Sequence, residues 1–319
     1  MSWDEKSVAT LNEVFSKLSF RRRYEVWFLR LGLADGSGAW WFRYLLMNPG
    51  RADCAANPQA KPFQVWATWF PAGGKPRSFI QGFGLEALDL SRKGQAPFHC
   101  RLSDNVIDED SCRGGLNVDG HRISWNLRYR STFRTTLSSK GWIGFSRTPH
   151  SDAVFSGKIT LDGGSYEGDP LGFGVQGHNC GYRHRNFWTW AHAYFLRAGK
   201  PATTLEALTY EMPFGLVFRK AVLWHNRQQH VFRNLRETFD RENMRWNVFC
   251  GTPSGMRIQV GIDGRGPGAL RLPYTKTDCS GTFEVANNSL ASASLFLESE
   301  GTAAERLEAP GGAVLEIVG

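Results

Sequence analysis

The ten residues HRISWNLRYR, His121–Arg130, show the pattern that decides the expected fold. Apolar and polar side chains alternate along them without interruption. One face would carry the large apolar side chains Ile123, Trp125, Leu127 and Tyr129. A period of two residues is typical of a strand with one buried face and one solvated face. The stretch therefore predicts a half-buried β-strand.

Short strand patterns of this kind continue along the rest of the chain. Two apolar runs, RYEVWFLRL (23–31) and AWWFRYLLM (39–47), flank a glycine-rich loop and predict a hairpin. Residues 4–18 are the best candidate for a helix, because their apolar side chains recur at helical spacing. The 12 Trp and 22 Phe residues, together with 35 Gly, favour short strands that enclose an apolar volume. The pattern is typical of barrels or sandwiches.

The 319 residues are long enough for two domains. The glycine-rich stretch GGSYEGDPLGFGVQG (163–177) lies near the middle, and we expect the domain boundary there. The predicted architecture is all-β, with antiparallel β-barrels at residues 1–172 and 173–319 and a short N-terminal helix. GFGVQG within this stretch has the spacing of a dinucleotide-binding loop. Because an aromatic strand follows it instead of a helix, we expect no nucleotide site.

Composition and charge exclude several classes of function. No apolar run is long enough to cross a bilayer, and the acidic N-terminal segment lacks the apolar core of a secretory signal, so we expect a cytoplasmic protein. The six cysteines form no C-x-x-C pair and are expected to be reduced thiols. The net charge of +8 comes from Lys and Arg residues spread along the chain, so we expect no nucleic-acid partner.

The segment GHNCGYRHRNFWTWAHAYF (177–195) is the densest in groups that bind cations or move protons. On a strand its second half would place Trp188, Trp190, His192 and Tyr194 on one face. A packed core seldom combines polar-tipped aromatic rings with a histidine, so we expect this face to line a ligand cavity within a barrel. The alternative is that these side chains only fill the barrel.

The same segment contains residue types that bind zinc. Its candidate ligands are His178, Cys180, His184 and His192, but their spacing matches no common zinc site. Two arginines between them would repel a cation. We therefore expect no bound metal.

Four stretches taken together resemble a known family. RRYEVWFLRL, AWWFRYLL, QGHNCG and FWTWAH follow one another as in the two-domain lipocalin-like proteins, which include carotenoid 1,2-hydratases (hydroxyneurosporene synthases), tocopherol cyclases, AttH proteins and fungal pericyclases. The similarity extends from Tyr24 to residue 297. It implies two lipocalin-like barrels packed together, with a ligand cavity at or near their interface. It also implies an isoprenoid- or polyketide-like ligand that is hydrated or cyclised without an organic cofactor.

The resemblance also implies site residues in the H-N-x-G motif. The histidine is His178 and the asparagine is Asn179, whereas Cys180 stands where the family commonly has tryptophan. Hydration needs a base that activates water, and histidine is the usual choice. The departure at Cys180 removes one ring that would face a cation.

The acid that protonates an alkene is expected in LEALTYEM (205–212). Glu211, directly after Tyr210, is the first candidate, and Glu206 is the second. Burial in an apolar cavity would keep such a carboxyl neutral near pH 7, and aromatic faces would stabilise the carbocation that follows. Tyr210 and Trp224 are further candidates for the cavity wall. The alternative for either glutamate is a solvated position on an outer face.

Two ligand-binding functions remain open on this basis. The protein is either a hydratase or cyclase, or a non-catalytic carrier or sensor of a lipophilic small molecule. The third alternative is a structural or partner-binding protein whose pocket has filled with side chains. A lipophilic ligand dissolves in membranes, so a peripheral contact with a membrane for ligand uptake is compatible with both functions. A buried carboxyl beside Trp188 or Trp190 would favour the enzyme, whereas a cavity filled with side chains would exclude both functions.

Overall fold

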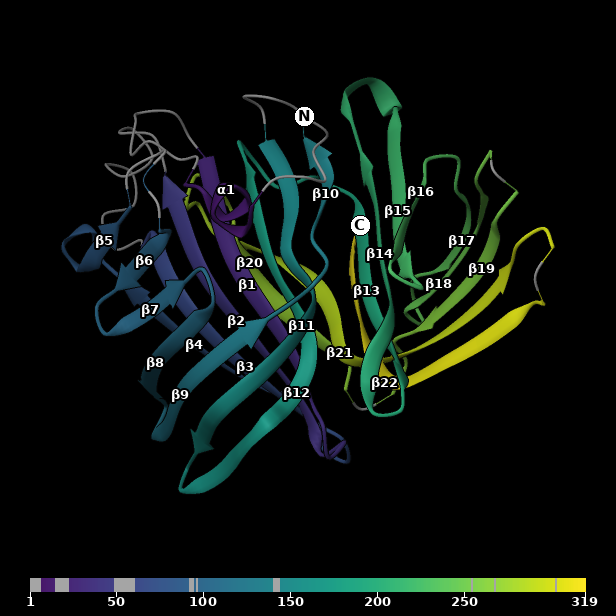
Figure 1. Cartoon of the computed structure of the whole chain (residues 1–319). Coiled ribbons are helices and arrows are strands. Elements are labelled where there is room, and N and C mark those ends of the chain that lie inside the picture. Colours follow the sequence, from purple (N-terminus) through teal and green to yellow (C-terminus); the bar gives the residue numbers. More distant parts are fainter. Residues whose placement is uncertain are drawn as a thin grey trace.

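The computed structural model consists almost entirely of antiparallel β-strands in two sheets that lie next to each other (Figure 1). This arrangement confirms the predicted all-β fold. The short N-terminal helix is also confirmed: α1 (Val8–Asn12) begins after the N-cap residue Ser7. Residues 4–6 and 15–18 of the predicted helix lie outside the described residues. The structure describes residues 7–14, 23–48, 61–91, 95, 97–139, 144–253, 255–266, 268–301 and 303–319.

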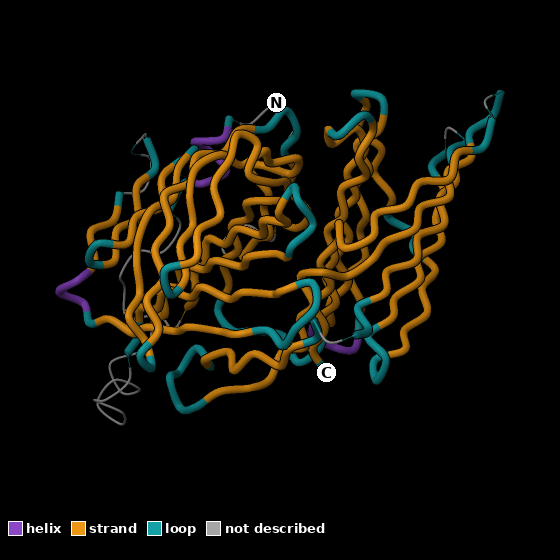
Figure 2. Tube along the Cα trace, turned by 90° about the horizontal axis from the view of Figure 1, so that it is seen from below, coloured by secondary structure: helices purple, strands orange, loops and turns teal. Residues whose placement is uncertain are grey.

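The first sheet contains twelve strands and curls around its own interior (Figure 2). Its order is β4-β3-β2-β1-β12-β11-β9-β8-β7-β6-β5, and β10 pairs with β11 beside this path. The strands are β1 (Arg23–Leu33), β2 (Gly38–Asn48), β3 (Phe63–Pro71), β4 (Arg77–Phe83), β5 (Leu88–Leu90), β6 (His99–Leu102), β7 (Asn105–Asp108), β8 (Ser111–Val118), β9 (His121–Arg130), β10 (Thr135–Ser139), β11 (Gly144–Leu161) and β12 (Gly164–Gly181).

The second sheet contains ten strands in the order β16-β15-β14-β13-β22-β21-β19-β18-β17, with β20 paired to β21. Short 3-10 turns, η2 (Leu85–Ala87) and η3 (Pro213–Gly215), lie in connections of the two sheets. The strands are β13 (Trp188–Arg197), β14 (Lys200–Glu211), β15 (Val217–His225), β16 (Gln228–Phe232), β17 (Arg236–Asp240), β18 (Arg245–Gly251), β19 (Arg257–Asp263), β20 (Leu270–Thr275), β21 (Thr282–Glu298) and β22 (Glu305–Val318).

The sheets divide between Gly181 and Trp188, so the boundary expected at 172/173 falls within β12. The end of β12 stays in the first sheet because it pairs with β1, where Gly181 lies opposite Tyr24. Among the described residues, no helix is long and apolar enough to span a membrane.

Strand β9 has the burial pattern that its sequence predicts. Every second side chain from Ile123 to Tyr129 is buried in the core of the first sheet, and the intervening side chains are exposed. Within this core the Trp125 ring packs on Phe42, and its Nε1 donates a hydrogen bond to the Tyr44 hydroxyl over 3.2 Å. The alternation therefore reflects a curled sheet with an apolar interior.

Strands β1 and β2 are buried on both faces because the second sheet covers the outer face of the first. Trp27 and Leu29 of β1 belong to the interior core of the first sheet. Phe28 between them packs instead with Trp41 of β2 and Trp190 of the second sheet. Burial on two faces explains why these strands are near-continuous apolar runs.

Each sheet also has a strand pair with shifted register that forms hydrogen bonds with polar side chains of the other sheet. The pairing of β21 with β22 shifts register at residues 288–293. The guanidinium of Arg30, on β1, donates from Nη2 to the carbonyl oxygens of Ser289 (2.6 Å), Gly311 (2.8 Å) and Ala313 (3.2 Å). Arg30 thus compensates its buried charge with backbone carbonyls of the second sheet.

The reciprocal contact lies on β11, whose pairing with β12 shifts register at residues 147–153. The Thr148 hydroxyl donates to Glu206 over 2.8 Å, and His192 Nε2 donates to the Ser151 carbonyl over 2.7 Å. The side chains of Glu206 and His192, both from the second sheet, are buried. These contacts fix the two sheets relative to each other.

We expect Arg30→Met to lower the free energy of unfolding by about 2–4 kcal/mol, because several buried carbonyls lose their donor. Urea denaturation followed by circular dichroism would measure the loss. Arg271→Met is the matched control, since that side chain is 72% exposed in a surface ion pair and contributes little. Equal stabilities of the two variants would contradict a docking role for Arg30.

Candidate functional site

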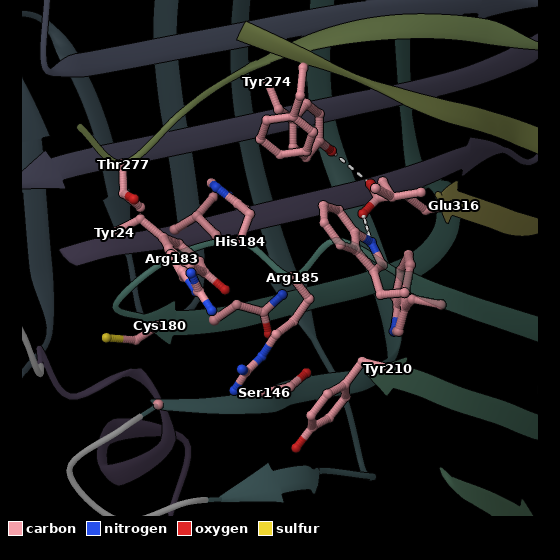
Figure 3. Close-up of a pocket in the computed structure, with 18 of the residues that line it drawn as sticks. Tyr24, Ser146, Cys180, Arg183, His184, Arg185, Tyr210, Tyr274, Thr277 and Glu316 are labelled. Atoms are coloured by element: carbon pink, nitrogen blue, oxygen red, sulfur yellow. Dashed lines mark hydrogen bonds between the residues drawn. The ribbon is translucent and has the colours of Figure 1, made fainter. Parts of the chain in front are cut away.

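A cavity of about 1120 Å³ lies between the two sheets (Figure 3). Its wall includes residues of β1, β2, β12, β13, β14, β20 and β22, and of the segment 182–186 that connects the sheets. Small-molecule sites commonly measure roughly 300–1,000 Å³, so this volume is ample for a ligand. The interface position agrees with the family resemblance. Trp188 and Trp190 of β13 line this cavity, whereas Ala191, Ala193 and Phe195 on the other face of the strand belong to a packed core within the second sheet.

Aromatic rings from both sheets line the cavity. The rings of Phe28 and Trp41 are stacked with centroids 5.3 Å apart, and Trp190 meets Phe28 edge-on at 5.4 Å. The hydroxyl groups of Ser138 and Tyr210 form a hydrogen bond of 2.9 Å that joins the first sheet to the second. Such a wall offers large flat faces to an apolar or cationic group.

One carboxylate is held inside this aromatic wall. Glu316 lies on β22 and is 8% exposed. Its Oε1 accepts a hydrogen bond from Trp188 Nε1 over 2.8 Å, and its Oε2 accepts one from the Tyr274 hydroxyl over 2.6 Å (Figure 3). The two donors fix the orientation of the carboxylate, and each oxygen keeps a lone pair for a further donor. Glu316 can therefore accept a proton from a bound molecule.

Two basic side chains of the cavity wall pack on tyrosine rings. The Arg43 guanidinium carbon is 3.7 Å from the centroid of the Tyr274 ring. His184 stacks on Tyr24 with ring centroids 4.2 Å apart. Burial, with a smaller contribution from Arg43, lowers the pKa of His184 to about 3. The imidazole is therefore neutral at pH 7, whereas the guanidinium is a cation.

A second carboxyl lies behind the wall. Glu206 is 2% exposed, and its Oε1 accepts hydrogen bonds from Trp190 Nε1 (2.9 Å) and Thr148. Burial raises the pKa of Glu206 to about 7, although the two hydrogen bonds oppose the shift. Glu206 contacts the cavity only through Trp190, whose ring forms part of the wall.

The structure brings together part of the predicted site. Five predicted residues line the cavity: Asn179, Cys180, Trp188, Trp190 and Tyr210. Six others do not: His178, His192, Tyr194, Glu206, Glu211 and Trp224.

His178 lies on the opposite face of β12, towards the interior of the first sheet. Its Nε2 is 2.8 Å from a carboxylate oxygen of Glu25, and its Nδ1 is 2.7 Å from the Leu11 carbonyl. The ring stacks on Trp27 and is fully buried. His178 therefore connects α1 to the first sheet, and the structure does not place it where a cavity ligand would touch it.

The remaining predicted residues stabilise the interface or lie at its edge. Tyr194 packs with Arg30 and Phe173 where the sheets dock. Trp224 stacks on Phe133 with centroids 4.5 Å apart. His192 binds the Ser151 carbonyl, and Glu211 is half-buried outside the cavity wall.

The four residues considered as metal ligands are also separated. His178 and His192 make the contacts described above, while Cys180 and His184 border the cavity. Within the described ranges, no three His, Cys, Asp or Glu side chains are grouped so that they could hold a metal ion.

Sequence reasoning missed Glu316, Tyr274 and Arg43. A signal for two of them is visible in hindsight. Arg43 interrupts the apolar run AWWFRYLLM, and Glu316 interrupts AVLEIVG. A charged side chain in a strand that is buried on both faces is costly unless it has a partner or a function. Tyr274 gives no comparable signal.

Comparisons with known proteins establish the fold. No family model matches the chain, and no curated protein matches its sequence. Among solved structures, CghA bound to Sch210972 aligns with a TM-score of 0.62 and 11% identity over 93% of this chain and 88% of that chain. The chain has the fold of that protein. Kievitone hydratase from Nectria haematococca aligns with a TM-score of 0.56 and 11% identity, covering 99% and 96% of the two chains.

A putative AttH from Nitrosomonas europaea aligns with a TM-score of 0.52 and 13% identity, covering 95% of this chain and 94% of that chain. The all-β lipocalin-like fold that the sequence motifs imply is thereby confirmed. The alignments cover nearly all of each chain, so both sheets belong to the shared fold.

Proposed function

We propose that this protein is an enzyme that binds a lipophilic small molecule between its two sheets and hydrates or cyclises it by proton transfer, without an organic cofactor. The observation that carries the proposal is Glu316, held by Trp188 and Tyr274 in an aromatic cavity. A carrier needs the cavity but no oriented carboxylate. Kievitone hydratase, a protein named for a hydration, has the same fold, which supports this reaction class.

The geometry suits a hydration in which Glu316 acts first as a base and then as an acid. The carboxylate takes a proton from water while the water oxygen bonds to one carbon of a double bond. The same proton is then returned to the neighbouring carbon, so the product gains one water and Glu316 is restored. Because the water oxygen bonds before the proton is returned, negative charge develops on the neighbouring carbon, so this step needs a double bond conjugated to an electron-accepting group. The faces of Trp41, Trp188 and Trp190 would hold the apolar body of the substrate.

The test is a panel of isoprenoid alkenes, conjugated polyenes and prenylated phenols. Quenching of tryptophan fluorescence would detect binding, because three tryptophans line the cavity. Mass spectrometry would detect products, since hydration adds one water and cyclisation gives an isomer with a new retention time. We expect at least one compound to bind and to be converted. Saturable binding across the panel without any product would instead establish a carrier.

The membrane contact is a further part of this proposal. Phe214 is 100% exposed and Leu216 is 60% exposed, on the turn that follows Tyr210 and β14. Replacing both by serine should lower binding to phosphatidylcholine–phosphatidylglycerol vesicles about tenfold, because apolar area no longer enters the lipid. Vesicle co-sedimentation would measure this, with serine at the exposed Phe249 and Phe296 as the control pair. Equal sedimentation of both double variants would exclude this turn.

A further inference from the structure

Two buried arginines lie on the same face of the first sheet, and only one is hydrogen-bonded by the protein. Arg30, on β1, is fully buried and donates from Nε and Nη2 to backbone carbonyls of the second sheet, although its Nη1 has no partner among the described residues. Arg43, on the neighbouring β2, is 3% exposed; its Nη1 likewise has no partner, and its side chain donates no hydrogen bond to any described residue. A buried cation without a hydrogen-bonded partner is costly. The two residues therefore call for different explanations.

Aromatic rings supply part of the compensation for Arg43. Its guanidinium carbon lies 3.7 Å from the centroid of Tyr274, in the second sheet, and 4.6 Å from the centroid of Trp66, in the first. Such contacts are worth roughly 2 kcal/mol when they are desolvated. This is less than the cost of burying a full charge. Because Arg43 forms part of the cavity wall, a bound anion can supply the remainder.

The acidic side chains of the wall are held by other residues. Glu316 accepts hydrogen bonds from Trp188 and Tyr274, which are neutral, so its charge also acts on Arg43 across Tyr274. Glu284 pairs with Arg271, and Asp278 accepts two hydrogen bonds from Ser280. Further cations of the wall are Arg183, Arg185 and Lys276. The cavity is therefore able to receive a negative group.

We infer that Arg43 forms an anion subsite and that the ligand is a lipophilic organic acid, a carboxylate or an equally acidic enol. The planar guanidinium offers parallel donors that match such a group. The apolar body of the ligand would lie on Phe28, Trp41 and Trp190. This inference rests on the proposed function and names its substrate class.

Tyr274 links this subsite to the proposed base. Its ring lies against Arg43, and its hydroxyl donates to Glu316. The headgroup and the reacting atom would therefore both lie next to Tyr274. A substrate held in this way would react at a carbon close to its acidic group.

Retinoic acid and methyl retinoate are suitable probes, because they share one polyene and differ at the headgroup, which is a carboxylate in the acid and a neutral methyl ester in the other. Quenching of tryptophan fluorescence gives the Kd of each. We expect the acid to bind wild-type protein at least about tenfold more tightly than the ester, and Arg43→Gln to abolish that preference with little effect on the ester. Arg43→Lys should keep part of the preference, since it retains the charge but not the planar donors.

Arg271→Gln, on β20 with a side chain 72% exposed, is the control and should bind both probes like the wild type. Circular dichroism of each variant would verify that it folds. The ratio of the two Kd values for wild-type protein tests the subsite even if a variant does not fold. Equal binding of the two probes, or an unchanged preference in Arg43→Gln, would overturn the anion subsite and leave the lipophilic cavity intact. Absence of binding by both probes would count against the subsite and the proposed function together.

Discussion

Glu316→Gln is expected to lower kcat by roughly 100- to 10,000-fold for whichever panel compound the wild type converts, which is the usual range for the loss of a general base or acid. Glutamine has the same shape and still offers one acceptor oxygen to Trp188 or Tyr274. Its amide cannot take a proton from water at neutral pH. We therefore expect the Kd of the compound to change little while turnover is lost. Product formation by mass spectrometry and fluorescence quenching measure the two effects separately.

Glu308→Gln is the matched control for this experiment. Glu308 lies on the same strand, β22, in a surface ion pair with Arg306, and 53% of its side chain is exposed. Its replacement should leave turnover unchanged. If Glu316→Gln turns over the compound as fast as the wild type, Glu316 is not the base and the proposed mechanism is wrong, even if the cavity binds the ligand.

Local sequence patterns predict strands well here because the period of a strand is set by neighbouring residues. The alternation of His121–Arg130 appears unchanged as the burial pattern of β9. The apolar runs at 23–31 and 39–47 became the paired strands β1 and β2. Burial on both faces removes alternation, so these runs do not reveal which side chains face the second sheet.

The segment 188–195 shows where such patterns stop being informative. Alternation separates Trp188 and Trp190 from Ala191 and Ala193, and the structure has this separation. What the aromatic face meets depends on how the second sheet docks on the first. Docking is set by contacts such as Arg30 with Ser289, which are 259 residues apart. The aromatic face therefore lines an interface instead of a barrel interior.

The site itself depends on contacts of the same kind. Trp188 and Glu316 are 128 residues apart, and Glu316 and Tyr274 are 42 residues apart. The pairing of β13 with β22 brings the first two together. Motif similarity identified His178, but the direction of its side chain follows from its pairing with β1 opposite Trp27. A motif indicates the neighbourhood of the cavity without fixing which of its side chains enter it.

Glu206→Gln is expected to remove about 3 kcal/mol of pH dependence from the stability of the protein. Burial raises the pKa of Glu206 from 4.5 to about 7, so the folded protein holds this proton more tightly than the unfolded chain. The contribution of Glu206 to stability is fully present below pH 4.5. It falls as the pH rises towards 7 and is constant above that, where the buried carboxylate is charged in the folded state.

Urea denaturation at pH 5 and pH 8 gives the change in the free energy of unfolding between these pH values for the wild type and for the variant. Comparing the two changes cancels any effect of the substitution that does not depend on pH. The wild type should lose about 2–3 kcal/mol more between these pH values than Glu206→Gln does, because part of the effect is already lost at pH 5. Glu211→Gln, on the same strand but half-buried and outside the contact with β11, is the control and should behave like the wild type. If Glu206→Gln keeps the full pH dependence, another group causes it, and Glu206 is not a carboxyl that the interface holds neutral. At pH 5 to 6 a neutral Glu206 would place no negative charge in the contact between the two sheets. The comparison of the two variants therefore also tests why an acidic side chain is tolerated next to Trp190 in this contact.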